Sequence, residues 1–319
     1  MEDKKLIISS APHIVTTKDT TSMMQTTIIA LMPSLCWAIY ILGFRALVQT
    51  IICVFFCTAF EWVTRRILKR KQTVQDMSSV VTGIMLSFIL PVNLPIWMTI
   101  IGCFIAIVIV KQLFGGLGSN FANPTAVAGI VLLISFPKEM TTWVITDRMC
   151  PAVIATAATG GATPIDLFTN ASNIPTNLQM FFGFVSGPAG ELSALMLLIG
   201  GFILIIKKVI DPIAPLCFIG SVIIISVIAG YDPFFQVCAG GVLLGSIFMA
   251  SDPVTTPTTY LGKAIFGLGC GALTMFMRRY ATYPDSMLFA ILFMNILTPQ
   301  INAITRSRVY TGNTTGGKE

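Results

Sequence analysis

Charged residues are scarce in this chain. Only 11% of its 319 residues are Asp, Glu, Lys or Arg, whereas 55% are hydrophobic, and the mean hydropathy is +0.83. A soluble domain carries about 25% charge, so the composition excludes a water-soluble globular protein and predicts a polytopic membrane protein in contact with lipid. The net charge of +6 is interpreted as loop charge that sets orientation, not as a nucleic-acid-binding surface.

Histidine is nearly absent, and the cysteines are scattered. The one histidine, His13, lies in the polar N-terminal tail, which excludes bis-histidine haem ligation and histidine-based metal sites within the chain. Of the eight cysteines, Cys53 and Cys57 alone have i, i+4 spacing. Because no second pair matches them, these thiols are interpreted as core residues, and no protein metal site is expected.

Long apolar runs recur along the chain, and about ten transmembrane helices are predicted from them. The third and eighth runs are short and end at prolines, so these two are predicted to be broken or re-entrant. A polar loop, 137–187, separates the first five runs from the last five, and polar tails cover 1–22 and 302–319. The runs are 23–43, 46–63, 77–91, 95–114, 121–136, 188–206, 213–230, 234–250, 262–279 and 284–301.

Lysine and arginine set the predicted orientation. With the N-terminus inside, the inner segments carry 15 of the 20 basic residues, and the cluster from Arg65 to Lys71 weighs most. Both termini are therefore expected on the cytoplasmic side of the membrane, with loop 137–187 on the outer face. Five basic residues fall outside in this topology, namely Arg45, Lys138, Arg148, Arg278 and Arg279.

An internal repeat fits this topology. The motif PVNLP at 91–95 is followed 162 residues later by PVTTP at 253–257, and the prolines that start later apolar runs, Pro124 and Pro284, are 160 apart. These offsets predict two five-helix repeats. Because each repeat has an odd number of spans, the second repeat is expected to lie inverted in the membrane relative to the first. The predicted repeats are 23–136 and 188–301.

The long loop contains a polar, glycine-rich segment, TAATGGATPI, at 156–165. Gly160 and Gly161 give the backbone freedom, and Pro164 fixes the chain directly after Thr163. An enzyme that modifies a threonine needs an accessible hydroxyl on a chain that it can draw into its own pocket, and this segment offers one. The alternative is an ordinary connecting loop, since glycine and threonine are typical loop residues.

Asp252 is the intramembrane acid that the sequence singles out. It stands where an apolar run meets the proline-broken segment SDPVTTP, flanked by Ser251, Thr255 and Thr256. Carboxylate, hydroxyl and freed carbonyl oxygens at a helix break suit a hard cation such as sodium, so these four residues are predicted to line an ion pathway. The alternative is structural, because Asp-Pro can simply cap the next segment. Glu61 is interpreted as a local ion pair with Arg65.

Together these motifs resemble one protein family. Its pattern is carried by Asn123-Pro124 after GGLGSNFA, by GATP at 161–164 and by SDPVTTP at 251–257, on a ten-span plan over about 20–305. The resemblance is to the family that contains the D subunit of the Rnf complex, an ion-translocating ferredoxin:NAD⁺ oxidoreductase. The same family contains the B subunit of the sodium-pumping NADH:quinone oxidoreductase.

The resemblance implies cofactors and partners. It implies FMN joined through a phosphoester to Thr163, within Gly161, Ala162, Thr163 and Pro164, and it allows a non-covalent riboflavin. The positions that the family fills with an aspartate and with a serine or threonine hold Ala158 and Gly160 here. The implied partners are a flavin transferase, the FMN-bearing G subunit, membrane subunits A and E, and peripheral subunits B and C.

Two function hypotheses of different classes follow. In the first, the chain is a redox subunit that passes electrons through FMN at the outer face and couples them to Na⁺ or H⁺ transport. In the second, it is a solute or ion channel, since inverted five-helix repeats with broken helices also resemble the urea-channel fold. A third hypothesis is a structural anchor for redox partners. The GATP motif in the outer loop favours the first, because a channel has no need of it.

Overall fold

The computed structural model describes residues 19–154, 163–169, 175–280 and 286–306, so Gly161 and Ala162 of the predicted flavin motif lie outside the described residues. The described chain is helical throughout, and no strand occurs in these ranges. The first half contains α1 (Thr20–Leu42), α2 (Phe44–Ile67), η1 (Val74–Asp76), α3 (Ser78–Ile89), α4 (Ile96–Phe104), η2 (Ile105–Gln112) and α5 (Pro124–Ser135).

The loop and the second half complete the order of elements. Short helices occupy the loop: α6 (Pro137–Met140), α7 (Pro151–Ile154), α8 (Pro164–Thr169) and α9 (Asn177–Phe182). The second half contains α10 (Ala194–Ile206), α11 (Ile213–Ile228), α12 (Pro233–Cys238), α13 (Val242–Leu244), η4 (Gly245–Met249), α14 (Tyr260–Tyr280) and α15 (Met287–Thr305). The helix widens into π-helical geometry in η2 and η4.

Each apolar run that predicts a span coincides with helical structure. Among the described residues four helices, α1, α2, α14 and α15, are long and apolar enough to cross a membrane. Shorter apolar helices are α3, α4 with η2, α5, α10 and α11. The third run forms α3, a helix of 12 residues. The eighth run breaks after Cys238, where Gly240 (φ 60°) and Gly241 (φ 67°) adopt left-handed backbone conformations that interrupt a right-handed helix.

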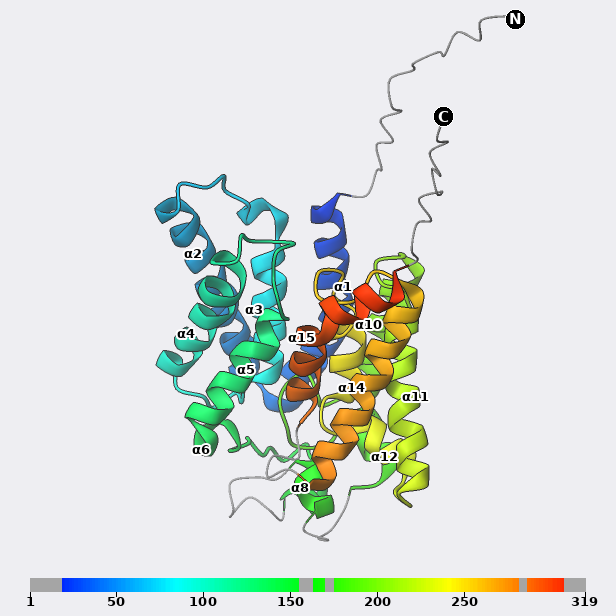
Figure 1. Ribbon diagram of the computed structural model, residues 1–319. Coiled ribbons are helices and arrows are strands. Elements are labelled where there is room, and N and C mark those ends of the chain that lie inside the picture. The colour runs from blue at the N-terminus through cyan, green and yellow to red at the C-terminus, as the bar shows by residue number, and fades with distance from the viewer. Residues whose placement is uncertain (1–18, 155–162, 170–174, 281–285, 307–319) are drawn as a thin grey trace, which may run out of the picture.

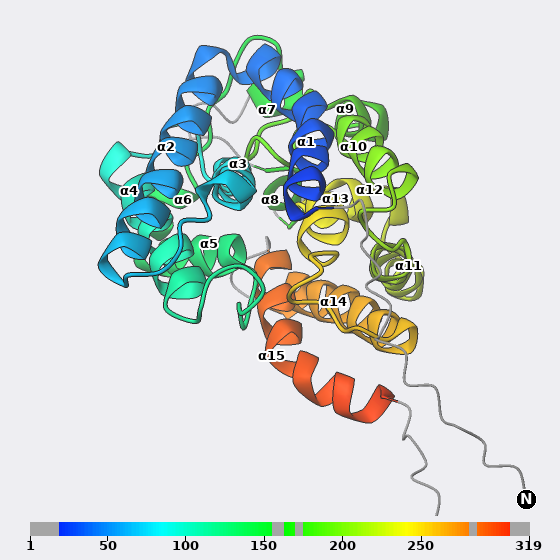
Figure 2. The same cartoon turned by 90° about the horizontal axis from the view of Figure 1, so that it is seen from above.

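The two halves meet through equivalent helices. The first helix of each half packs against its counterpart, α1 against α10, and the fifth helices α5 and α15 also touch. Figure 2, seen from the end that carries the termini, shows α2 to α5 gathered on one side and α10 to α14 on the other. In Figure 1 both termini leave the bundle at one end, whereas α6 and α8 lie at the opposite end.

The outer surface of the bundle is apolar. Large hydrophobic side chains such as Phe55 on α2, Ile228 on α11 and Ile304 on α15 are 63%, 80% and 82% exposed. Exposed apolar surface on this scale suits contact with lipid or with other membrane subunits, which supports an integral membrane protein. The buried interior is continuous across both halves, with Phe88 of α3 and Phe218 of α11 fully enclosed.

Two glycines permit close approach of helix backbones. A Cβ atom placed on Gly83 of α3 would lie 2.7 Å from the Cα of Val54 on α2, and one on Gly200 of α10 would lie 2.2 Å from the carbonyl oxygen of Ala30 on α1. Small residues at such crossings are the usual solution for helices packed in lipid. Gly83 therefore fixes the position of α3, the short helix that reaches the middle of the bundle.

We predict that Gly83→Ala destabilises the purified protein in detergent by about 1–3 kcal/mol, because the added methyl group meets backbone and not a movable side chain. Thermal unfolding followed by circular dichroism measures the change. Gly220→Ala on α11 is the matched control, since nothing lies within 4 Å of a Cβ added there. Equal melting temperatures for Gly83→Ala and the wild type would contradict the close packing of α2 and α3.

Candidate functional site

Thr163 directly precedes helix α8, which lies at the end of the bundle opposite the termini (Figure 1). Its hydroxyl donates to Oδ2 of Asp166 at 2.8 Å, and its backbone N–H donates to the same oxygen at 3.0 Å. The N–H of Asp166 in turn donates to the Thr163 hydroxyl at 3.3 Å. These reciprocal bonds form a capping box, with Pro164 at the first helical position where its missing N–H costs nothing.

The Thr163 side chain is buried in this conformation. The residue is 1% exposed, and Ile165 beside it joins a small apolar cluster with Met180, Val185 and Phe235. The expectation of an accessible hydroxyl is therefore wrong for the folded loop. The physical reason is the cap, because the hydroxyl that was expected to be free in a flexible segment satisfies the first turn of α8 instead.

A cavity of about 70 Å³ lies next to this cap, between the two halves. We call it the loop-side cavity. Ile89 and Leu133 line it from the first half, Gly240 and Leu288 from the second, and two acidic residues face it, namely Asp166 and Glu191. Glu191 lies in the turn before α10 and approaches the helix break, since a Cβ on Gly241 would be 2.5 Å from its Oε1.

The segment around Asp252 turns back on itself directly after η4. Oδ1 of Asp252 accepts from the N–H of Val254 at 3.3 Å, and the carbonyl of Asp252 accepts from the hydroxyl of Thr256 at 2.7 Å. The Ser251 hydroxyl donates to the carbonyl of Ser246 at 3.0 Å, while that of Thr255 lies 3.5 Å from Oδ2 of Asp252. The Asp252 carboxylate thus stabilises the local turn, with Oδ1 accepting from a backbone N–H and Oδ2 from the Thr255 hydroxyl, and the next helix, α14, begins only at Tyr260.

Asp252 and Ser251 also line a second cavity, of about 90 Å³, at the end of the bundle that carries the termini. We call it the termini-side cavity. Two charged side chains line it, Asp252 from the second half and Lys111 from the first, together with Ser78, Asn120 and other residues of both halves. The side-chain carbonyl oxygen of Asn120 has no hydrogen-bond partner among the described residues. Thr255 and Thr256 do not line this cavity, although Thr256 borders a neighbouring one.

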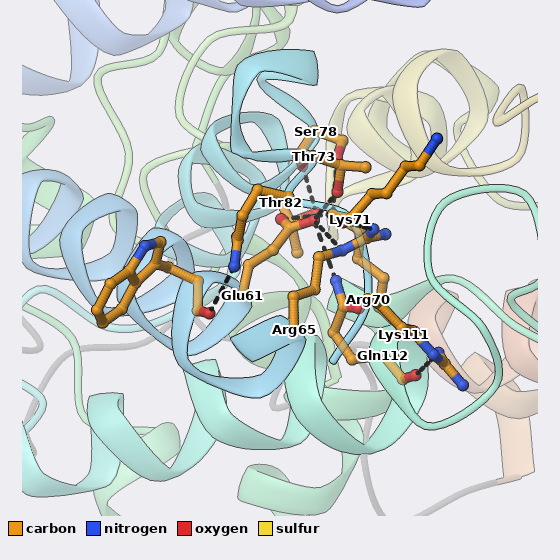
Figure 3. Close-up of polar contacts among 11 residues, drawn as sticks. Glu61, Arg65, Arg70, Lys71, Thr73, Ser78, Thr82, Lys111 and Gln112 are labelled. Carbon is orange, nitrogen blue, oxygen red and sulfur yellow. Dashed lines mark hydrogen bonds and ion pairs between the residues drawn. The ribbon is translucent and has the colours of Figure 1, made fainter. Parts of the chain in front are cut away.

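Lys111 is tied to Glu61 in a buried polar cluster (Figure 3). Its Nζ donates to Oε2 of Glu61 at 3.0 Å, and Gln112 and Thr73 each donate to Oε1 at 3.0 Å. Glu61 is 0% exposed and Lys111 is 1% exposed. The predicted pair with Arg65 exists, with 3.7 Å between Nε and Oε1. It is the longest of these contacts, so the local i, i+4 interpretation misses most of what holds Glu61.

The sequence carried one signal for this cluster. Lys111 is the single charged residue within the apolar run 95–114, and the charge count assigned it to an inner loop. The structure places it instead in η2, where the π-helical turn adds a residue and turns the side chain toward α2 and α3. Local widening of this kind often marks a functional position.

Arg278 was counted among the outer basic residues, and the structure gives it a different place. It lies near the end of α14, and its guanidinium donates to the carbonyls of Gln236 at 2.7 Å and Ala239 at 2.6 Å. These carbonyls belong to the last turn of α12 and to the residue after it, and the break at Gly240 leaves them without helical partners. Arg278 is therefore a cap inside the bundle and not a loop charge that opposes the predicted orientation.

The cysteines behave as core residues. Cys53 and Cys57 on α2 are buried, and Cys103 on α4 joins them, its thiol 3.7 Å from the carbonyl oxygen of Cys53. Among the described residues no group of three His, Cys, Asp or Glu side chains is placed to hold a metal ion. The interpretation of the cysteine pair as packing agrees with this burial.

Comparison with known proteins identifies the family of this chain. It matches the NQR2, RnfD, RnfE family over residues 7–311. It is 41% identical to the D subunit of the Na⁺-translocating ferredoxin:NAD⁺ oxidoreductase complex of Acetobacterium woodii, over 97% of this chain and 96% of that one. It is 35% identical to the D subunit of the proton-translocating ferredoxin:NAD⁺ oxidoreductase complex of Clostridium ljungdahlii, over 94% of each chain. The D subunit of an ion-translocating oxidoreductase complex of Vibrio atlanticus is 32% identical, over 95% of this chain and 98% of that one. The chain belongs to the NQR2, RnfD, RnfE family.

Proposed function

We propose that this chain is the membrane electron-transfer subunit of an ion-translocating ferredoxin:NAD⁺ oxidoreductase complex, and that it carries FMN on Thr163. The observation that supports it is the match to the D subunits of such complexes along nearly the whole chain. Because these relatives are subunits of oxidoreductase complexes, we propose that the chain acts beside other subunits that bind nicotinamide and hold clusters. We expect these to be the G subunit with its own FMN, membrane subunits A and E, and peripheral subunits B and C.

The orientation is part of the proposal. Both termini leave one end of the bundle, and the basic cluster from Arg65 to Lys71 follows α2 at that same end (Figure 1). Basic residues favour the cytoplasmic side. We therefore place the termini in the cytoplasm of a bacterial cell and Thr163, at the opposite end, on the outer face of the inner membrane. The contacts of α1 with α10 and of α5 with α15 support two inverted five-helix repeats.

The Thr163 hydroxyl is the right chemical group for a phosphoester, but in the folded structure the side chain is buried. The hydroxyl is present and hydrogen-bonded to the Asp166 carboxylate, an acceptor that could hold the proton as the oxygen is esterified. A flavin cannot be attached to a side chain that is 1% exposed, so Thr163 must leave its cap before modification. Loss of such a cap costs only about 1 kcal/mol, which is small enough for a transferase to supply by binding the loop.

The cation path is proposed to run between the two halves. Asp252 supplies a carboxylate to the termini-side cavity, and Ser251 and Asn120 line the same cavity. Oxygen ligands of this kind suit Na⁺ as well as H⁺. The stretch of α3 between Met85, which lines this cavity, and Ile89, which lines the loop-side cavity, rises about 6 Å. A short stretch of the bundle therefore separates the termini-side cavity from the loop-side cavity.

We predict that the complex purified after co-expression with its flavin transferase shows flavin fluorescence in the band of this chain on a denaturing gel, and that Thr163→Ala abolishes it. A flavin joined through a phosphoester stays on the chain during denaturation, whereas a non-covalently bound flavin is released. Thr176→Ala is the matched control, because Thr176 also caps a short helix of the same loop through a capping box. Its band should stay fluorescent.

A dark wild-type band would show that Ala158 and Gly160 have broken the motif, and a channel or anchor without a redox cofactor would then be the better function. Fluorescence that persists in Thr163→Ala would move the attachment to another residue. Flavin extracted by acid from the Thr163→Ala complex, identified by chromatography, tests separately for the non-covalent riboflavin that the family resemblance allows.

We predict that Asp252→Asn lowers cation transport at least tenfold in inverted vesicles driven by ferredoxin oxidation, because the amide keeps the turn but loses the charge that attracts the cation. Uptake of ²²Na⁺ and acidification of the lumen are measured in parallel to identify the ion. Asp211→Asn is the control, since Asp211 pairs with Lys263 at the surface of the same end. Equal transport by Asp252→Asn and the control would remove Asp252 from the pathway.

A further inference from the structure

The buried lysine of η2 has no role in the function proposed so far. Lys111 is 1% exposed and lies on the wall of the termini-side cavity, with Asp252 on the part of the wall that the second half contributes. An ammonium group held away from water costs several kcal/mol unless it is paired. A protein that needed only packing at this position would be served by an apolar side chain, so the charge requires an explanation.

The partners of Lys111 hold its ammonium at one edge of the cavity. Nζ donates to Oε2 of Glu61 at 3.0 Å and to the hydroxyl of Ser78, the first residue of α3, at 2.7 Å. Asp252 lines the same cavity from the second half. Among the side chains labelled in Figure 3, those of Arg65, Thr73, Lys111 and Gln112 reach Glu61, and that of Ser78 lies beside Lys111. Lys111 therefore bonds one carboxylate directly and shares a cavity with a second one.

The charges of Asp252 and of the Glu61, Arg65 and Lys111 cluster beside it balance when no cation is bound. Glu61 and Asp252 contribute two negative charges, whereas Arg65 and Lys111 contribute two positive ones. A cation that binds at Asp252 adds an unbalanced positive charge in a region of low dielectric constant, where like charges repel strongly. The nearest mobile charge that can relieve this repulsion is the ammonium of Lys111 on its flexible four-carbon stem.

We propose that Lys111 is a tethered counter-cation of the Asp252 site, which neutralises Asp252 when the site is empty and is drawn back to Glu61 and Ser78 when the transported cation binds. The proposal rests on Asp252 as the cation site. Lys111 acts as a positioning residue for the transported ion, and its repulsion keeps binding weak enough for release. Glu61 is the acceptor that holds the lysine in its retracted place.

The experiment compares cation dependence and maximal rate in the intact complex reconstituted in liposomes. With Lys111→Gln, the Na⁺ concentration for half-maximal ferredoxin:NAD⁺ activity should fall about tenfold, an ordinary size for coupling between two sites. The rate at saturating Na⁺ should fall too, because release is slower. Lys111→Arg keeps the charge and should keep the wild-type half-saturating concentration. Lys263→Gln, which removes a lysine paired with Asp211 at the same end, should change neither value.

If the wild-type complex translocates protons, the same comparison is made along pH, and Lys111→Gln should move half-maximal transport to higher pH because Asp252 then holds a proton more tightly. The charged groups near Asp252 are Lys111 across its cavity and the Asp211–Lys263 pair, which borders the adjoining one. Where Lys111→Gln removes the shortest ion pair of Glu61 and the complex does not assemble, the double variant Glu61→Gln/Lys111→Gln removes both charges of that pair and should show the same tightening.

The outcomes separate this inference from the function on which it rests. Half-saturating values that stay unchanged in Lys111→Gln and in the double variant, while Asp252→Asn abolishes transport, would refute the counter-cation and leave the cation site intact. A lower maximal rate without tighter cation binding would also refute it and would assign Lys111 a structural role. Unchanged transport in Asp252→Asn would refute both.

Discussion

A helix that breaks inside a bilayer releases backbone N–H and C=O groups, and hydrocarbon offers them no partners. This bundle contains such breaks, and the side chains that satisfy them are among its few charged and polar residues. Arg278 caps the carbonyls of α12, and Asn123 caps α5 while its amide donates to the carbonyl of Met249 at the end of η4. The position of each broken segment therefore depends on one polar side chain from another element.

Two basic residues held within the bundle occupy related places. Lys111 lies near the end of the fourth run of the first half, and Arg278 lies near the end of the fourth run of the second half. Each reaches the start of the short third element of its own half, Lys111 at Ser78 and Arg278 at the break before α13. One lies at the termini end and the other at the loop end, which is the arrangement that the proposed inverted repeats would give. Their partners differ. Arg278 donates hydrogen bonds to backbone carbonyl oxygens, whereas Lys111 donates to a carboxylate and shares a cavity with a second one.

The sequence predicted the helices well and the polar contacts poorly, for a physical reason. Apolar runs and prolines are local signals, so the positions of α1 to α5 and α10 to α15 could be predicted from them. Two partners of Glu61, Lys111 and Gln112, lie about 50 residues away in the chain, and nothing local indicates them, whereas the local pair with Arg65 could be predicted. The same limit misled the charge count, in which Lys111 and Arg278 were treated as loop residues although both are held within the bundle. The GATP motif identified a residue but not its burial, since the cap that buries Thr163 forms only when α8 folds.

Under the proposed function, the two acidic sites lie where electron transfer and ion movement would meet the two ends of the chain. Asp166 and Glu191 face the cavity beside the proposed flavin threonine, and Asp252 faces the cavity at the other end. Moving one charge between these ends against 100 mV costs about 2.3 kcal/mol, so the ion must bind weakly enough at each end to leave again. A fixed carboxylate alone would hold a cation in a region of low dielectric constant too tightly. In the proposed mechanism, Lys111, which lines the same cavity, would lower that affinity without blocking the path, because its flexible stem would let the ammonium move between Asp252 and Glu61.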